Sequence, residues 1–239
     1  MPYLSVSGYF FFEMIKKYSK YVFELIAIFI AVMLSFIVEN YRIDLEKSND
    51  LDAILRVILK DLKQDSLVLS TNKSRYELFN EIDKDVLSDN PSTPESIRKF
   101  TWNLYGSASD YFSTMGYNLL QQSSVIDALD MSIASQLNEY YDIDIRAFKV
   151  KKEFEVRSTF NIHDHISEIL PYRLSDIVKN ENSKSFDHSS IKKLYREPST
   201  YNKIFILNEL RINNKKINQD LIEANEDLRQ SITEYLKNR

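Results

Sequence analysis

The sequence predicts an all-α protein: a single N-terminal transmembrane helix that continues into a long helix, followed by an antiparallel helical bundle. Two observations predict this fold. The 239 residues include only 3 Gly and 5 Pro, and so few helix breakers favour long helices. One apolar run lies near the N-terminus, and apolar residues recur at three- and four-residue spacing through most of the remaining chain.

Three parts are expected from this pattern. Residues 1–20 form a cytoplasmic or interfacial N-terminal segment, residues 21–41 a transmembrane helix and residues 42–239 an extracytoplasmic helical-bundle domain. Hydrophobic residues make up 44% of the chain and charged residues 28%, which is typical of a folded protein with a core. The net charge of -4 offers no basic face for nucleic acid, so no nucleic-acid partner is expected. Cysteine is absent, which excludes disulfides and thiolate metal sites.

The apolar run from Tyr21 to Val38 has the length and composition of a membrane span. After Glu24 it contains no charged residue. At about 1.5 Å per residue its length is roughly 27 Å, close to the hydrocarbon thickness of a bilayer. A buried core helix is the alternative, but the run is apolar on every face, which favours lipid.

The flanks of this run predict its orientation. Lysines are denser before it than after it, so the positive-inside rule places the N-terminus in the cytoplasm and the large domain outside. In a two-membrane bacterium, this orientation predicts a single-pass protein of the bacterial inner membrane with a periplasmic C-terminal domain. No small-x-small cleavage site follows the run, which favours an uncleaved anchor over a signal peptide. The expected interface anchors are Phe10, Phe11, Phe12, Lys16, Lys17, Lys20, Tyr41 and Arg42.

A stripe of small residues lies within the span. Ala27, Ala31 and Ser35 recur every four residues, a spacing that lets two helix backbones approach closely in lipid. Glu24 lies on the same stripe, where its carboxylate either reaches the interface near Lys20 or faces a partner helix. The stripe predicts membrane-helix packing, although alanine is common enough in membrane helices for the spacing to arise by chance.

Helical periodicity continues beyond the span. The first apolar positions of this continuation are Leu51, Ile54, Leu55, Ile58, Leu59 and Leu62. The pattern extends to about Leu87, with a weak point at residues 70–72 where a kink or turn is expected. A break follows at residues 89–94, where Thr93 can cap a helix that begins with Pro94.

Three further helical stretches are expected, at residues 119–141, 147–170 and 201–236. The first is either one helix or a helix broken near Gln122–Ser124. Loops are expected at 105–109 and 179–198, and a turn at Gly116. Tyr140 and Tyr141 are expected in the core. The first and last helices could pair as a coiled-coil-like stalk, within one chain or between chains.

The segment Glu24–Arg42, with its acidic residue, apolar span and polar-aromatic exit, resembles an uncharacterised family of bacterial single-pass membrane proteins with a helical domain of unknown function. The sequences KDLKQD (60–65), SDYFSTMGYNLL (109–120), SQLNEYYD (135–142) and ILNELRINNKK (206–216) are similar to that family too. The family usually has Gly inside the span, where this chain has Phe29, Ile30 and Ala31, and Trp at its exit, where this chain has Tyr41. The resemblance implies the topology, and it implies no activity, cofactor or catalytic residue.

Catalytic and metal-binding motifs are missing from the sequence. His163 and His165 are two residues apart and would diverge on a helix, and no H-E-x-x-H frame is present. Gly-rich phosphate loops and G-x-S-x-G elbows are absent as well. Lys149, Lys151 and Lys152 are interpreted as a solvated face. We therefore expect no catalytic, cofactor-binding or metal residue, and no enzyme activity.

These observations favour a non-catalytic membrane-anchored interaction or accessory subunit. It would oligomerise, dock on a larger membrane complex, or do both, with lipid and either a second copy or a membrane protein as partners. A sensor that transmits a signal along its helices is one alternative. An ion-coupled subunit that uses the intramembrane carboxylate of Glu24 is the other.

Overall fold

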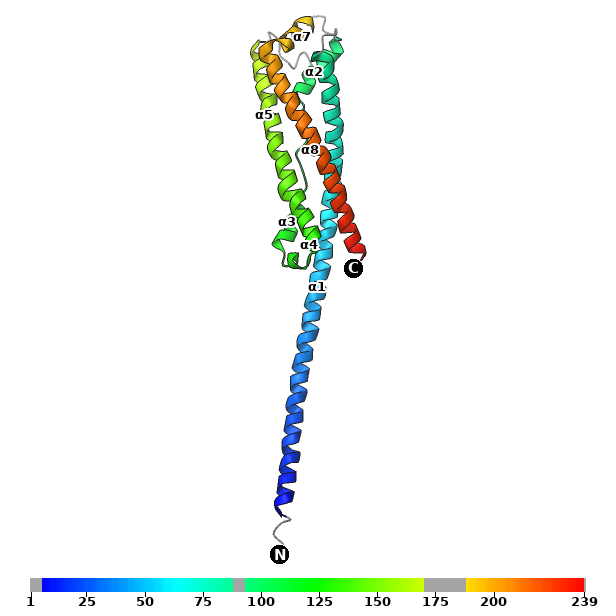
Figure 1. Ribbon diagram of the computed structural model, residues 1–239, viewed down its shortest axis with the longest axis vertical. Helices are drawn as coiled ribbons and strands as arrows, with labels where there is room; N and C mark the ends of the chain where they lie inside the picture. The colour runs from blue at the N-terminus through cyan, green and yellow to red at the C-terminus, as the bar shows by residue number, and fades with distance from the viewer. Residues whose placement is uncertain (1–5, 88–92, 170–187, 239) are drawn as a thin grey trace. The chain divides into compact units, whose positions relative to one another are not determined.

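The computed structural model describes residues 6–87, 93–169 and 188–238 (Figure 1). Every regular element in these ranges is helical, so the all-α prediction is confirmed for the described chain. The chain divides into two compact units, Met1–Leu51 (unit 1) and Asp52–Arg239 (unit 2).

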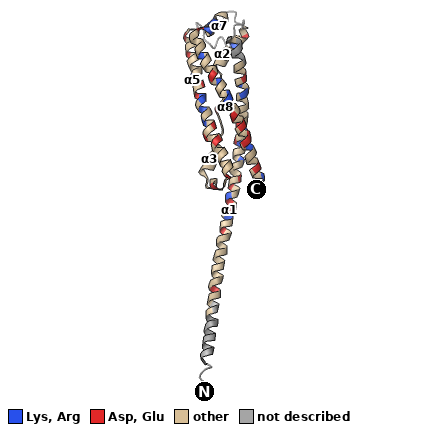
Figure 2. Ribbon diagram, viewed as in Figure 1, with Lys and Arg blue, Asp and Glu red and all other residues tan. Residues whose placement is uncertain are grey.

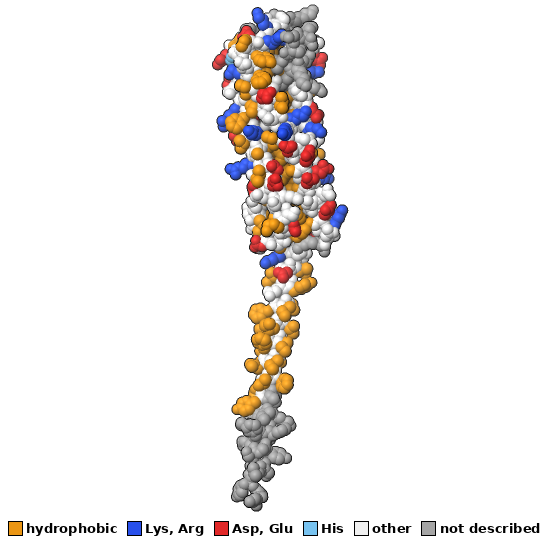
Figure 3. All heavy atoms as spheres, in the orientation of Figure 1, with side chains coloured by type: hydrophobic (Ala, Val, Ile, Leu, Met, Phe, Trp, Pro, Cys, Tyr) orange, Lys and Arg blue, Asp and Glu red, His pale blue; other side chains and the backbone are white. Residues whose placement is uncertain are grey.

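Unit 1 consists of the first part of helix α1 (Val6–Leu87). Its side chains from Tyr21 to Lys47 are all exposed, and large apolar ones crowd the face drawn in Figure 3. By length and composition, α1 could cross a membrane, and it is the one helix of the described chain that could. The prediction of a long apolar N-terminal helix is therefore confirmed.

Helix α1 continues through residues 70–72 without interruption, so the expected kink there is wrong. The physical reason is that Asn72 faces the interior of unit 2. Its Nδ2 donates to the Ser109 carbonyl oxygen at 2.8 Å, and its Oδ1 accepts from the Ser109 backbone N–H at 2.8 Å. The polar residue that suggested a break instead holds another part of the chain against the helix.

Helix α2 (Pro94–Tyr105) begins as predicted, because the Thr93 side chain accepts a hydrogen bond from Ser96 N at 3.1 Å. Residues 106–114 then have no regular secondary structure, and we name this segment the strap. Helix α3 (Met115–Gln122) follows. Gly116 lies inside α3 instead of marking a turn, and a Cβ atom there would lie only 2.7 Å from the backbone nitrogen of Ile58.

The stretch predicted as helical over 119–141 is divided, and the alternative of a break near Gln122–Ser124 is confirmed, because α3 ends at Gln122. It contains the end of α3, a 3₁₀ turn η1 (Ile126–Ala128), helix α4 (Met131–Asn138) and the start of a π-helical segment η2 (Glu139–Asp144). Tyr140 and Tyr141 are buried as expected. Helix α5 (Ile145–Ile169) then follows.

The end of the polar stretch predicted as a loop over 179–198 is helical. Residues 188–196 form helix α7 (His188–Arg196), and residues 179–187 lie outside the described chain. The loop prediction is wrong for α7 because Ile191, Leu194 and Tyr195 share one face, which is buried against α2 and α8. Helix α8 (Pro198–Lys237) completes the chain.

The buried positions of three helices repeat at alternating spacings of three and four residues, the heptad pattern of helices packed side by side. On α1 they include Leu55, Ile58, Leu62, Asp65, Leu69, Asn72, Tyr76 and Phe79. On α5 they are Ile145, Phe148, Lys152, Glu155, Thr159, Ile162 and Ile166. On α8 they are Thr200, Ile204, Leu207, Arg211, Asn214, Asn218, Leu221, Asn225, Leu228 and Ile232.

Contacts between these helices fix their directions within unit 2. Asn225 Nδ2 donates to the Leu62 carbonyl oxygen at 3.0 Å, and Asn218 Nδ2 donates to that of Leu69 at 3.0 Å. The higher-numbered residue of α8 contacts the lower-numbered residue of α1 in these two pairs, so the two helices run in opposite directions. Helix α8 also packs against α5, which brings polar residues of all three helices into one interior.

Candidate functional site

The four residues predicted to pack a membrane helix lie on α1 in unit 1. Glu24, Ala27, Ala31 and Ser35 are all exposed. The Ser35 hydroxyl donates to the Ala31 carbonyl oxygen at 2.9 Å, which satisfies its donor within the helix. At four-residue spacing the three small side chains share one side of the helix. The stripe is therefore accessible to a partner.

Two of the predicted interface anchors have described side chains. Tyr41 is 70% exposed. The Arg42 guanidinium forms ion pairs with Glu39 at 2.7 Å and with Glu46 at 2.8 Å. The remaining anchors lie in α1, but their side chains are outside the described set: Phe10, Phe11, Phe12, Lys16, Lys17 and Lys20. Their interfacial role stays a prediction.

The side chains of His163 and His165 have different neighbours. The His163 ring packs edge-on against Tyr105 with centroids 5.0 Å apart, whereas His165 Nε2 lies 3.1 Å from Thr200 Oγ1. The His188 side chain is outside the described set. Within ranges 6–87, 93–169 and 188–238, no group of three or more His, Cys, Asp or Glu side chains is placed to hold a metal ion.

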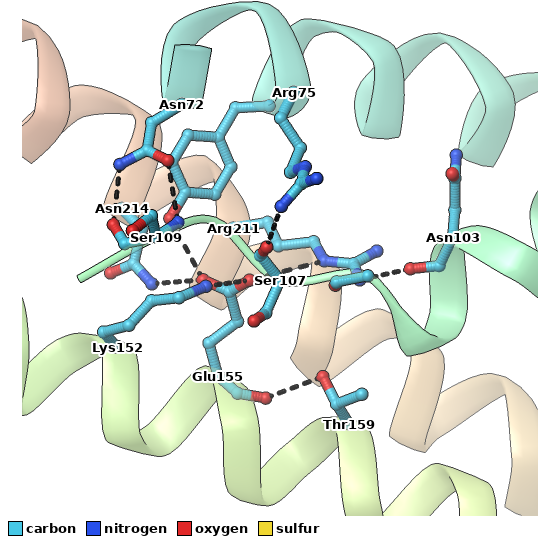
Figure 4. A network of polar contacts seen from close by, with 12 residues as sticks. Asn72, Arg75, Asn103, Ser107, Ser109, Lys152, Glu155, Thr159, Arg211 and Asn214 are labelled. Atoms are coloured by element: carbon cyan, nitrogen blue, oxygen red, sulfur yellow. Dashed lines mark hydrogen bonds and ion pairs between the residues drawn. The ribbon is translucent and has the colours of Figure 1, made fainter. Parts of the chain in front are cut away.

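The most unusual chemistry of unit 2 is a charged cluster in its interior, which we name the Glu155 network (Figure 4). Glu155 is fully buried, and its Oε1 lies 2.6 Å from Lys152 Nζ and 3.9 Å from Arg211 Nε. Its Oε2 accepts from Asn214 Nδ2 at 2.7 Å and from the Tyr76 hydroxyl at 3.1 Å. One carboxylate thus joins residues of α1, α5 and α8.

Lys152 corrects the interpretation of Lys149, Lys151 and Lys152 as a solvated face. Lys149 and Lys151 are exposed, but Lys152 is only 1% exposed. Burial lowers the pKa of Lys152, while the Glu155 carboxylate opposes that shift. Burial also raises the pKa of Tyr76, with the Glu155 charge adding to the shift. Both effects follow from charge held in a medium of low dielectric.

Arg211 connects the Glu155 network to the chain around the strap. Its Nη2 donates to the carbonyl oxygens of Asn103 at 2.6 Å and Gly106 at 2.9 Å. Its guanidinium lies 3.9 Å from the centroid of the Phe79 ring, a distance typical of a cation–π contact. Arg211 thus fixes the point where α2 gives way to the strap.

Side chains of α1 hold the strap along its length. Besides the Asn72–Ser109 pair, Arg75 donates to the Ser107 carbonyl oxygen. Asp65 Oδ1 accepts from Ser113 N at 2.8 Å. Asp61 accepts from the Ser113 hydroxyl at 2.7 Å and from Gly116 N at 2.7 Å. Ala108 and Phe112 of the strap are buried, and buried backbone groups of an irregular segment need such partners.

Asp65 and Asp61 place two carboxylates one helical turn apart in the interior. Burial raises the pKa of Asp65 to about 6, and the neighbouring Asp61 charge adds to that shift. The Tyr140 hydroxyl lies 3.3 Å from Asp65 Oδ2 and 2.9 Å from Asn225 Nδ2. Burial and the Asp65 charge raise the pKa of Tyr140. The carboxylate oxygens of Asp61 and Asp65 accept hydrogen bonds from backbone N–H and side-chain O–H groups of the same chain. The two carboxylates therefore anchor the strap and the start of α3 to α1.

A small acidic hollow lies where η2 meets α8. Its volume is about 280 Å³, and its lining includes Glu139, Asp144 and Asp227. Burial raises the pKa of Asp144, and the nearby charges of Glu139 and Asp220 add to the shift. The other lining residues are Gln136, Tyr140, Ala224 and Leu228.

Sequence reasoning missed both buried networks. A usable signal was present on α8, where Arg211, Asn214, Asn218 and Asn225 occupy the three-four spacing of the buried face. Polar residues at such positions are typical of helices whose register is fixed by specific pairs. Their partners on α1, α5 and the strap are distant in sequence and could not be inferred from it.

No family model, curated protein or solved structure matches the chain. Functional inference therefore depends on the residues and contacts described above.

Proposed function

We propose that the chain is a non-catalytic accessory subunit anchored in the bacterial inner membrane by α1. In this proposal unit 2 is an antiparallel helical bundle in the periplasm, and the N-terminus lies in the cytoplasm. The subunit oligomerises or docks on a larger membrane complex through the stripe of Glu24, Ala27, Ala31 and Ser35.

The supporting observation is the exposure of every side chain from Tyr21 to Lys47, a stretch that contains the entire apolar run. In water, exposed apolar area of this extent is unfavourable by about 25 cal/mol per Å². Lipid or a partner helix removes that cost. Small residues on one side then favour helix–helix contact, because packing drives association in lipid.

The chemistry of unit 2 supports an interaction role over an enzymatic one. Glu155 and Lys152 are at most 1% exposed, so a substrate does not reach them in this structure. Their partners are Tyr76, Arg211 and Asn214, which hold helices together. Such buried polar groups are best attested as devices that fix register and partner choice.

Cysteine crosslinking in native membranes tests the proposed packing stripe, since the chain contains no natural cysteine. Ala31→Cys is expected to give a crosslinked dimer or a crosslink to another membrane protein. Phe29→Cys, on the opposite side of the helix, is the matched control and is expected to crosslink weakly. Equal crosslinking at both positions, or none at either, would contradict the stripe.

Thiol labelling tests the proposed orientation. Met131 is 84% exposed in unit 2, so Met131→Cys is expected to react with a membrane-impermeant maleimide in cells with a permeabilised outer membrane. Ser5→Cys is expected to react only after the inner membrane is opened. The opposite pattern would reverse the topology.

Glu24 motivates a second candidate, an ion-coupled role. It is an acidic residue at the start of the apolar run and on the small-residue stripe. Carboxylates within membrane segments are commonly functional. The substitution Glu24→Gln preserves shape and removes the charge. Loss of cellular function with unchanged Ala31→Cys crosslinking would favour ion coupling, whereas unchanged function would eliminate it.

A further inference from the structure

The part of helix α1 that belongs to unit 2 carries a charge-free stripe on its exposed side, which we name the outer stripe. Leu67 and Leu78 are 68% and 48% exposed, and Gln64, Thr71 and Ser74 are exposed as well. The five residues follow spacings of three, four, three and four, the pattern of a coiled-coil seam. All five lie outside the buried heptad positions of α1, so the outer stripe is a second seam that the described chain leaves open.

The hydroxyl-bearing members of the outer stripe lose little when a partner covers them. The Thr71 hydroxyl donates to the Leu67 carbonyl oxygen at 2.9 Å, and the Ser74 hydroxyl donates to that of Ser70 at 3.4 Å. Their donors are thus satisfied within the helix, which lowers the cost of removing water from them. Both side chains are short, so another helix can approach closely.

The direction of α1 limits how a second copy can meet this stripe. Helix α1 is uninterrupted from Val6 to Leu87, so two copies with the same topology in one membrane have parallel α1 helices. In a parallel two-fold pair, seam residues face the same residues of the other copy. A charged seam residue would therefore face a like charge, whereas an uncharged stripe avoids this repulsion.

We propose that the outer stripe is a self-association surface, which packs parallel against the outer stripe of a second copy of this chain. The two Leu67 side chains pack together, and so do the two Leu78 side chains. Each Gln64 amide has a donor and an acceptor, so the two amides hydrogen-bond across the axis and fix the register. This inference rests on the proposed function and names the partner and its surface.

The residues beside the outer stripe suit this pairing. In a parallel coiled coil, the residue before one seam position faces the residue five positions later in the other copy. Lys63 then faces Val68, and Ser70 faces Arg75, whose guanidinium already donates to the Ser107 carbonyl oxygen. Neither contact brings like charges together.

The exposed apolar residues of α5 do not suit a parallel pair. Ala147, Val150 and Phe154 also follow a seam spacing and are exposed. The same geometry would place Arg146 of one copy opposite Lys151 of the other, a like-charge contact that the two-fold symmetry repeats. The charge pattern therefore selects α1 over α5.

The outer stripe is short, and this limits the affinity. It covers roughly 21 Å of helix at about 1.5 Å per residue, and we expect it to bury less than the roughly 1,600 Å² of a standard stable interface. The contact is therefore expected to be weak in dilute solution. Confinement in a membrane raises the local concentration of the two copies and favours the contact.

Disulfide formation in the purified full-length protein in mild detergent tests the geometry. Ser74→Cys is expected to form a disulfide-linked dimer under oxidising conditions, because the two seam residues face each other. Lys73→Cys is exposed on the same helix but points about 100° away from Ser74, so it is the matched control and is expected to form little dimer. Equal yields at both positions, or no dimer at Ser74, would overturn the proposal.

A mixture of Gln64→Cys and Leu78→Cys proteins with different tags tests the direction. Two antiparallel stripes centred on Thr71 would bring residues 64 and 78 together, whereas parallel stripes keep them roughly 21 Å apart along the helix. We expect disulfides between copies of the same variant and none between the two variants. A dominant mixed disulfide would overturn the parallel arrangement.

Charges introduced at Thr71 test the pairing itself. Thr71→Lys and Thr71→Asp, each combined with Ser74→Cys, are expected to reduce the disulfide about five- to tenfold when each protein is alone, because like charges then face each other. A mixture of the two proteins is expected to restore it, since opposite charges then meet. Restoration distinguishes pairing from damage to the fold, and its failure would overturn the proposal. If Ala31→Cys still crosslinks when Ser74→Cys does not, only this inference fails and the proposed function stands.

Discussion

Units 1 and 2 distribute polar and apolar side chains in opposite ways. In unit 1, apolar side chains such as Phe23, 72% exposed, point outward, and charged residues are sparse along the apolar run (Figure 2). The surface of unit 2 drawn in Figure 3 carries charges of both signs, and Lys152, Glu155 and Asp65 are buried inside. The interior of unit 2 is thus more polar than the exposed surface of the apolar run.

The difference indicates where each unit finds its stabilising partners. The buried charges of unit 2 have partners within the chain, for example Arg211 and Asn214 around Glu155. The apolar residues of unit 1 are left uncovered by the described chain, and in the proposed function lipid or a partner helix covers them.

Removal of the Glu155 charge should have the largest effect. Glu155→Gln leaves Lys152 and Arg211 buried without their shared anion, so the free energy of unfolding should fall by about 3–5 kcal/mol. Urea denaturation followed by circular dichroism measures this. Glu153→Gln, two residues away and exposed, should change stability by less than about 0.5 kcal/mol. Equal effects of the two variants would contradict the internal pairing.

An aspartate placed at an exposed apolar position should have different effects in the two units, because the proposed function puts residues 21–41 of unit 1 in lipid and the surface of unit 2 in water. Ile30→Asp in unit 1 should hinder membrane insertion by about 2.5–3.5 kcal/mol, because it puts a carboxylate at the middle of the span. Leu67→Asp on the exposed surface of unit 2, where Leu67 is 68% exposed, should be nearly neutral. The membrane-integrated fraction of each variant is the measurement, and equal fractions would count against the span.

Gly116→Ala should reveal how closely α3 approaches α1 in unit 2. The added Cβ would lie 2.7 Å from the Ile58 backbone nitrogen, which forces a backbone shift that costs about 1–3 kcal/mol. Gly106→Ala is the control, because its nearest neighbour is the Phe79 ring at 3.1 Å, and a side chain adjusts more easily. In thermal unfolding, the midpoint temperature of Gly116→Ala should fall further below that of the wild type than the midpoint of Gly106→Ala.

Asp65→Asn should change the pH dependence of unit 2. The folded pKa of about 6 lies above the unfolded value of about 3.9, so the folded state binds the proton more tightly. The charged carboxylate therefore opposes folding above pH 6, and that contribution disappears as the pH falls through 6 towards about 4.

The amide oxygen introduced by Asp65→Asn should accept from Ser113 N without the charge, and the variant should be more stable at pH 7.5 by about 1–2 kcal/mol. Its advantage should shrink as the pH falls from 7.5 to about 4.5 in urea denaturation. A constant difference between wild type and variant across that range would contradict the assignment to Asp65.

Local features of the fold were predictable from the sequence. The helix that includes Leu55, Ile58 and Leu62 follows from apolar spacing, and the start of α2 follows from Thr93 and Pro94. Both signals act within one or two helical turns. Helix α7 was missed because its composition is polar, although Ile191, Leu194 and Tyr195 already show helical spacing.

The interior of unit 2 was not predictable in the same way. Lys152 resembles its exposed neighbours Lys149 and Lys151 in sequence, and only Glu155 and Arg211 account for its burial. The strap is held by Asp61, Asp65 and other polar residues of α1, where sequence polarity suggested a weak point at 70–72. Contacts between distant segments decide these positions, and local patterns do not encode them.

The most direct test of the membrane-anchor proposal is alkaline carbonate extraction of membranes from cells that express the full-length chain. A helix that spans the bilayer stays in the pelleted membrane at high pH, whereas surface-bound and soluble proteins are released. We expect the protein in the pellet. Recovery of folded protein in the supernatant would contradict a membrane location for residues 21–41.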